Sequence, residues 1–148
     1  MISPEQKIFL IILSYLIGSI STSIIICRLK KVDITSIGSG NAGATNTVRA
    51  LGKKYGAIVL ILDILKGLIP TLIAKLLSPD SLILPICCSF AVVAGHVFPI
   101  YFNFKGGNGA ATIIGTIVVI FPLGSLICLI TWVSVLILSG YVGLATVI

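Results

Sequence analysis

Residues 55–77 read YGAIVLILDILKGLIPTLIAKLL, an apolar run interrupted by only three charged side chains. A run of this kind has about the 20 residues that a helix needs to cross the ~30 Å hydrocarbon layer of a bilayer. Two further apolar runs cover residues 8–26 and 82–100. With 57% hydrophobic and 9% charged residues and a mean hydropathy of +1.23, the chain lacks the polar surface of a water-soluble domain. The sequence therefore predicts an all-α membrane protein, a polytopic helical bundle.

The last apolar run, residues 110–138, is too long for one ordinary span. Phe121-Pro122-Leu123-Gly124 interrupts it, and there proline removes a helix donor while glycine permits a turn. We expect two short helices, with one long kinked helix as the alternative. Residues 141–148 are interpreted as the beginning of a further helix. The chain is thus predicted to hold about five helices in a single domain, 1–148.

The first run carries three serines at positions 19–23, which resemble the cleavage region of a signal peptide. A signal peptide places its cations before the apolar segment, whereas here three cations follow it at positions 28–31. We therefore predict that residues 8–26 form one transmembrane helix.

Of the net charge of +6, most of the positive charge lies between the first and second runs, and Lys105 follows the third. The opposite side has two lysines, offset by Glu5 and Asp80. Cations favour the cytoplasmic side, so the long loops are predicted to be cytoplasmic and the N-terminus external. The four cysteines lie in or beside apolar runs without metal-ligand spacing, so we expect packed side chains and no metal.

The first polar segment, residues 37–49, reads IGSGNAGATNTVR. It matches G-x-G-x-x-G by chance, because no βαβ unit surrounds it, and we reject a dinucleotide site. A short helix from about residue 42 to 51, capped by Ser39 or Asn41, would point free amides at an anion. Asn46 and Arg49 then share one face, where the arginine can grip a phosphate. The alternative is a flexible linker whose cations set the topology and touch lipid headgroups.

The second polar segment, residues 95–112, reads GHVFPIYFNFKGGNGAAT. Its three glycines after Lys105 and before a helix have the pattern of a phosphate-cradling loop, with an ordinary glycine-rich turn as the alternative. His96 is more often a packed, hydrogen-bonded residue than a catalyst in such a place. Asp63 and Lys66, three residues apart within a span, predict an internal ion pair that orients the site.

These segments closely resemble the bacterial acyl-phosphate:glycerol-3-phosphate acyltransferases, the PlsY family. The matching stretches are GSGNAGATN at 38–46 with Arg49, LGK at 51–53, LDILKG at 62–67, GHVFP at 95–99 and FKGG at 104–107. The resemblance implies a seven-helix bundle in a bacterial inner membrane. It also implies transfer of a fatty acyl group from acyl phosphate to the sn-1 hydroxyl of glycerol-3-phosphate, which gives lysophosphatidic acid for phospholipid synthesis.

The resemblance places the catalytic residues at Ser39 and Arg49. The predicted substrate-binding residues, taken from the resemblance and from the two segments, are Gly40, Asn41, Asn46, His96, Lys105, Gly106, Gly107, Asn108, Gly109 and Thr112. No cofactor is implied. The expected partners are glycerol-3-phosphate, acyl phosphate and membrane lipids, and no nucleic acid.

Three departures from the family are visible. Asn108 replaces an expected lysine, residues 140–146 lack an expected arginine and serines, and about fifty C-terminal residues of the family have no counterpart. We therefore expect a C-terminally shortened relative. A catalytically degenerate protein that binds a phosphometabolite or lipid without turnover is the alternative function, and a small transporter is a third.

Overall fold

The computed structural model describes residues 2–140, and the predicted helix start at 141–148 lies outside them. The described part is helical and contains no strand, which confirms the predicted class. In chain order its elements are α1 (Pro4–Gly18), α2 (Thr22–Leu29), the 3-10 turn η1 (Ile34–Ser36), α3 (Ala44–Leu51), α4 (Lys53–Leu77), α5 (Ile83–Val97), the 3-10 turn η2 (Ile100–Phe102), α6 (Ala110–Ile120) and α7 (Pro122–Ser139).

Four helical stretches are long and apolar enough to cross a membrane: Pro4–Leu29, Lys53–Leu77, Ile83–Phe102 and Pro122–Ser139. The shorter apolar helix Ala110–Ile120 joins them. Many large apolar side chains on these helices are exposed, as lipid-facing residues are, including Ile61 at 56% and Phe90 at 75%. The protein is therefore a multi-pass membrane protein.

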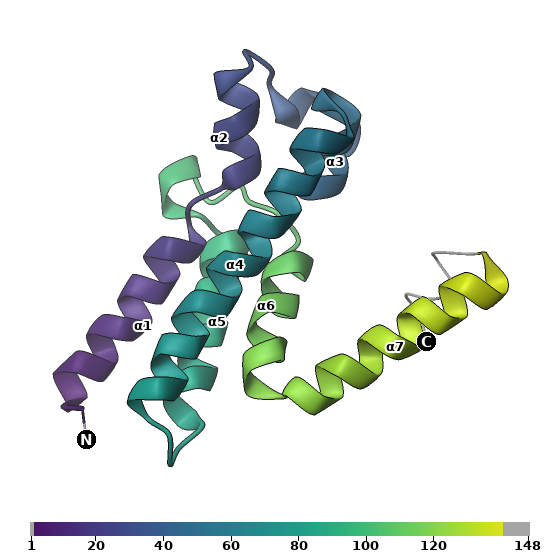
Figure 1. The fold of residues 1–148 in the computed structure, drawn as a ribbon. Helices are drawn as coiled ribbons and strands as arrows, with labels where there is room; N and C mark the ends of the chain where they lie inside the picture. The colour runs from purple at the N-terminus through teal and green to yellow at the C-terminus, as the bar shows by residue number, and fades with distance from the viewer. Residues whose placement is uncertain (1, 141–148) are drawn as a thin grey trace.

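The first predicted span is confirmed within Pro4–Leu29, but it is broken into two helices, because α1 ends at Gly18 and α2 begins at Thr22 (Figure 1). At the end of α1 the Ser19 hydroxyl donates to the Tyr15 carbonyl at 2.9 Å. Serine hydroxyls compete with the backbone ladder in this way. The break leaves the Ile20 carbonyl without its helical donor, and the Lys66 ammonium donates to it at 3.0 Å. A residue forty-six positions away thus stabilises the break.

Two helix crossings depend on glycine. A Cβ on Gly18 of α1 would collide with the Val92 carbonyl of α5, and one on Gly95 of α5 would collide with α1. In the same way Gly67 of α4 and Gly115 of α6 each face the backbone of the other helix. Small residues allow membrane helices to approach closely where hydrophobic burial does not drive association. These contacts fix the pairs α1–α5 and α4–α6.

The predicted division of the last apolar run is confirmed. α6 ends at Ile120, α7 begins at Pro122, and α7 leaves the bundle at a wide angle (Figure 1). The Lys75 ammonium donates to the Val119 carbonyl at 2.7 Å, which satisfies one carbonyl at the end of α6.

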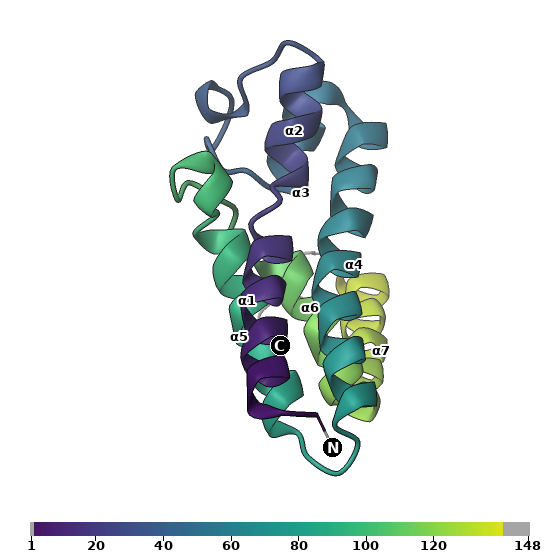
Figure 2. The same ribbon diagram turned by 90° about the vertical axis from the view of Figure 1, so that its left-hand side faces the viewer.

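The two polar segments lie at the same end of the bundle. α2, η1, α3, η2 and the glycine-rich stretch before α6 gather there, whereas the N-terminus and the α4–α5 turn lie at the other end (Figures 1 and 2). The order of the spans therefore brings the candidate site residues together.

Candidate functional site

The loop that carries Ser39 is fixed by hydrogen bonds to the side chain of Asn46, a residue of α3 that is 2% exposed. Its side-chain amide donates to the carbonyls of Ile34 at 3.1 Å and Ile37 at 2.9 Å. Its carbonyl oxygen accepts from the Ser39 backbone N–H at 3.3 Å. Both amide hydrogens are thus used by the loop, so the geometry gives Asn46 a positioning role; its predicted contact with substrate stays a prediction.

Left-handed backbone at Gly38 (φ +54°) and Gly40 (φ +68°) turns the chain on both sides of Ser39. A Cβ on Gly38 would lie 2.5 Å from the Asn46 side-chain oxygen and 3.1 Å from Cδ of Arg49. Glycine is therefore required for the close approach of this loop to α3. Ser39, which is exposed, directly follows the glycine that approaches the arginine of α3.

The predicted helix caps are wrong. α3 begins at Ala44, and Gly43 occupies the N-cap position without a side-chain cap. Ser39 instead accepts from the Asn41 N–H at 3.4 Å, a local turn contact. The loop has to reach back to Asn46, and this places both polar residues too early in the chain to cap the helix.

Arg49 is exposed and lies on the face of α3 that is turned toward Gly38. Within residues 2–140 no hydrogen bond or ion pair engages its guanidinium. An exposed arginine beside a glycine turn can make two parallel hydrogen bonds to a phosphate. Ser39 and Arg49 are therefore both available to a ligand.

The glycine-rich stretch packs on the end of α5 and reaches the first loop. A Cβ on Gly106 would collide with the His96 carbonyl, and one on Gly107 with the His96 ring and the Ala42 carbonyl. The Gly107 N–H donates to the His96 carbonyl at 3.2 Å, so this amide is not free for a phosphate. Glycine at both positions therefore brings the two polar segments into contact.

Lys105 and Asn108 are exposed, whereas Gly107 and Gly109 between and beside them are buried. Gly109 adopts φ +83° and directly precedes α6. Lys105 also lines a cleft of about 710 Å³ between the α2–η1 connection and η2. Neither Ser39 nor Arg49 lines that cleft. Lys105 therefore lies at the cleft as well as in the glycine-rich stretch that contacts the first loop.

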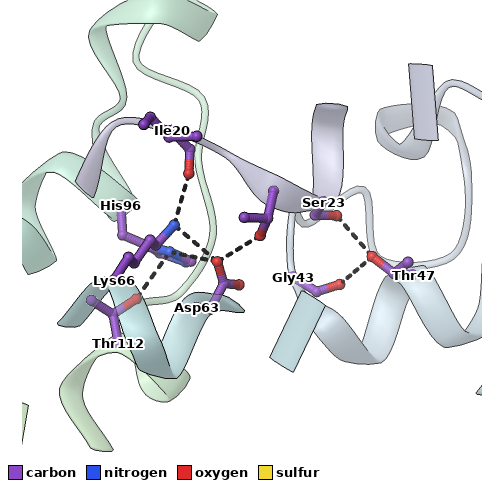
Figure 3. A network of polar contacts seen from close by, with 9 residues as sticks. Ile20, Ser23, Gly43, Thr47, Asp63, Lys66, His96 and Thr112 are labelled. Atoms are coloured by element: carbon purple, nitrogen blue, oxygen red, sulfur yellow. Dashed lines mark hydrogen bonds and ion pairs between the residues drawn. The ribbon is translucent and has the colours of Figure 1, made fainter. Parts of the chain in front are cut away.

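A buried polar network lies beneath these loops (Figure 3). The Lys66 ammonium and the Asp63 carboxylate form the predicted internal ion pair at 2.9 Å. The Thr22 hydroxyl donates to the same carboxylate oxygen at 2.7 Å. Asp63 and Lys66 are 2% and 8% exposed, so their charges are compensated inside the protein rather than by solvent.

His96 and Thr112 belong to this network rather than to the open loops. His96 Nδ1 lies 3.2 Å from the Thr112 hydroxyl and 3.8 Å from the Asp63 carboxylate. His96 is 6% exposed and Thr112 is fully buried. The geometry gives both residues a supporting role, and their predicted substrate contacts stay predictions.

The sequence interpretation missed a second buried contact. The hydroxyls of Ser23 and Thr47 lie 2.8 Å apart, and Thr47 also donates to the Gly43 carbonyl at 3.0 Å (Figure 3). This pair fastens α3 to α2. The available signal was the group of serines at positions 19–23 inside an apolar run, which we attributed only to a possible cleavage site.

A family profile described as glycerol-3-phosphate acyltransferase matches residues 8–148. The chain belongs to the glycerol-3-phosphate acyltransferase family. A relative with this name from Aquifex aeolicus (strain VF5) is 46% identical over 143 residues, 96% of this chain and 74% of the relative. Another, from Francisella tularensis subsp. holarctica (strain OSU18), is 44% identical over 140 residues, 94% of this chain and 68% of the relative.

Two solved structures have the same fold as this acyltransferase family member. Both are crystal structures of PlsY (YgiH), an integral membrane glycerol 3-phosphate acyltransferase, at 45% identity. The glycerol 3-phosphate form superimposes with a TM-score of 0.85 over 95% of this chain and 70% of that chain. The lysophosphatidic acid form gives a TM-score of 0.82 over 95% and 69%. The resemblance inferred from the motifs is thus confirmed.

Proposed function

We propose that the protein transfers a fatty acyl group from an acyl phosphate to the sn-1 hydroxyl of glycerol-3-phosphate, giving lysophosphatidic acid and phosphate. The observation that carries this proposal is that an exposed Ser39 directly follows Gly38, which approaches the exposed Arg49 of α3. Asn46 holds the Ser39 loop, and within residues 2–140 no hydrogen bond or ion pair engages the Arg49 side chain. The family and the names of the related structures support the glycerol-3-phosphate part. The acyl-phosphate donor rests on the motif resemblance.

The proposed reaction suits these residue types. The glycerol hydroxyl oxygen attacks the acyl carbonyl carbon, the bond from that carbon to the phosphate oxygen breaks, and phosphate leaves with the bonding electrons and takes up the proton. Because phosphate is a good leaving group, the protein has mainly to hold two anions together and to stabilise developing charge. Arg49 and Lys105 offset the repulsion between the substrates, and Ser39 orients the hydroxyl or the phosphate.

Asn108 favours a second candidate function, binding without turnover. It is exposed beside Lys105 and the two loop glycines, where it offers hydrogen bonds but no charge. A site with one cation fewer holds a dianionic substrate less firmly, and retention of substrate without product would identify this function.

The decisive assay uses the purified full chain in detergent with radiolabelled glycerol-3-phosphate and, separately, acyl phosphate or acyl-coenzyme A. We expect lysophosphatidic acid from acyl phosphate alone. Product from acyl-coenzyme A alone would contradict the proposed donor. No product from a folded chain that still binds glycerol-3-phosphate would favour the non-catalytic function.

We also propose that the end of the bundle carrying both loops faces the cytoplasm of a bacterial inner membrane, because most of the cations gather there. A reporter enzyme that is active only on the external side of the inner membrane should be active when it is fused before Met1. The same reporter inserted between Lys31 and Val32 should be inactive. The opposite pattern would reverse the orientation.

A further inference from the structure

The cleft beside Lys105 has a composition unlike that of an ordinary loop crevice. It encloses about 710 Å³, and its cations are Arg28, Lys31 and Lys105. Among the described residues that line it, Asp33 is the one carboxylate, Thr35 and Asn103 add neutral polar groups, and apolar side chains such as Ile24 and Val32 form part of its wall. Three cations and one carboxylate give the lining a net charge of +2. The cleft therefore combines a positive edge with an apolar wall.

The negative charge in the lining is engaged in part by hydrogen bonds of the η1 turn. The Asp33 carboxylate accepts from the Thr35 hydroxyl at 2.7 Å and from the Thr35 N–H at 2.9 Å. These hydrogen bonds hold the pKa of Asp33 below its ordinary value, with a smaller contribution from Arg28. One oxygen of the carboxylate is thus engaged by the η1 turn, while within residues 2–140 no hydrogen bond or ion pair engages the side chains of Arg28, Lys31 or Lys105.

Two features of the cleft are unusual for a loop: an arginine held over an aromatic ring, and positive φ angles at residues other than glycine. The Arg28 guanidinium lies over the Phe102 ring, 5.4 Å from its centroid, a cation–π contact that helps to hold it at the cleft. In the described part of the chain, positive φ outside glycine occurs at Lys31 (59°), Asn103 (51°) and Phe104 (59°). Two of these residues line the cleft and the third follows directly.

Lys31 is the most informative of the three. The Val32 N–H donates to the Cys27 carbonyl and the Lys31 N–H to the Arg28 carbonyl, the hydrogen bonds of a helix end that usually carries glycine at position 31. A lysine at φ +59° departs from the backbone preference of its residue type. Strain of this kind concentrates at functional sites.

The position of the cleft indicates which ligand fits. It opens where two candidate spans end, at Leu29 and at Phe102, and hence at headgroup depth. We propose that it binds the headgroup of an anionic phospholipid from the surrounding leaflet, with the phosphate against Arg28 and Lys31 and the glyceride over the apolar wall. Basic residues at this depth attract anionic lipids. The proposal does not require acyl transfer, because Ser39 and Arg49 lie outside the cleft and the lipid phosphate is placed against Arg28 and Lys31. Lys105 is the cation that the cleft shares with the proposed substrate site.

The test uses the full chain purified in neutral detergent and incubated with mixed micelles that contain dioleoyl phosphatidylglycerol or dioleoyl phosphatidylcholine. Native mass spectrometry then counts the lipids retained. We expect one phosphatidylglycerol per chain and no retained phosphatidylcholine. Equimolar inorganic phosphate should not displace the lipid, because it lacks the apolar part. Displacement would assign the cleft to a soluble phosphate compound and overturn the proposal.

Two variants test the cations separately from folding. Lys31→Gly should retain phosphatidylglycerol at least about fivefold less, while its melting temperature stays equal or rises because glycine suits φ +59°. Arg28→Gln should show a similar loss. The matched control is Lys54→Gln, which removes the same charge from an exposed lysine outside the cleft. An equal loss in the control would show a general charge effect and overturn the proposal.

A final measurement separates the cleft from the proposed active site. The affinity for glycerol-3-phosphate, measured by calorimetry, should be unchanged in Lys31→Gly. A several-fold weaker affinity would make the cleft part of the substrate site and would also overturn the proposal.

Discussion

The exposed loop around Ser39 and the buried network around Asp63 are both polar, but their polar groups are used differently. In the loop, backbone groups are fastened to Asn46 while the Arg49 guanidinium remains open. In the network, the Asp63, Lys66 and His96 side chains all contact protein partners and are nearly closed to solvent. Both regions carry motifs of the same family, so motif membership alone does not distinguish a residue that meets substrate from one that supports it. Burial and saturation of hydrogen bonds make that distinction.

This comparison predicts that a change in the network acts first on stability. Lys66→Ala leaves a carboxylate buried without its cation, and breaking such a pair is expected to lower the free energy of unfolding by about 3–5 kcal/mol. Thermal unfolding in detergent measures the effect. The double variant Asp63→Asn/Lys66→Met removes both charges and should recover part of the loss. A single variant as stable as the parent chain would contradict the supporting role of the network.

A change in the loop should instead act on turnover while the fold stays intact. Arg49→Ala removes the guanidinium that α3 presents beside this loop and is expected to lower kcat about 10²–10³-fold, the range seen when a donor to transition-state charge is lost. The matched control is Lys54→Ala, an exposed cation beyond the end of α3. Rates and melting temperatures of both variants are compared. If Arg49→Ala lost activity only in proportion to its stability, the comparison between the two regions would fail.

The fold followed from the sequence wherever the cause was local. Apolar length gave the spans, and proline with glycine at 122–124 gave the break between α6 and α7. The break at 19–21 was not predicted, because serines are compatible with a membrane helix and the group that stabilises this break, Lys66, lies on α4. A sequence window cannot reveal a partner that only the packed bundle supplies.

In the candidate site, too, the features with a local cause were predicted, and those that depend on distant partners were not. The motifs located both loops and the Asp63–Lys66 pair, which needed only a spacing of three on one helix. The role of Asn46 and the true start of α3 depended on how the loop folds back across seven to twelve residues. Hydrogen bonds of this range are set by loop geometry rather than by residue type, so the caps were assigned to the wrong residues.

Asn46 lies between the two regions and should show both effects at moderate size. Asn46→Ala removes the partner of the Ser39 N–H and leaves the Ile34 and Ile37 carbonyls with one backbone donor each, which is expected to reduce stability by about 1–3 kcal/mol and to lower kcat through a displaced Ser39. Asn46→Asp keeps an acceptor for Ser39 but buries a charge against the Ile34 and Ile37 carbonyls, so it should be less stable than Asn46→Ala and yet retain more turnover per folded molecule. Equal rates in the two variants would mean that Asn46 does not position Ser39.

Asn108 offers the finest comparison, because it is exposed in the second loop and lies outside the network. Asn108→Lys adds a cation beside Lys105 and is expected to lower the KM for glycerol-3-phosphate by a few-fold, since one exposed charge pair contributes about 1 kcal/mol or less. Asn108→Asp, nearly the same size with the opposite charge, should raise that KM. Both shifts should shrink when the ionic strength rises from 0.01 to 1 M, because salt screens exposed charges. Shifts in the same direction for both variants would indicate an effect of loop shape rather than of charge, and would remove Asn108 from the residues that face the substrate.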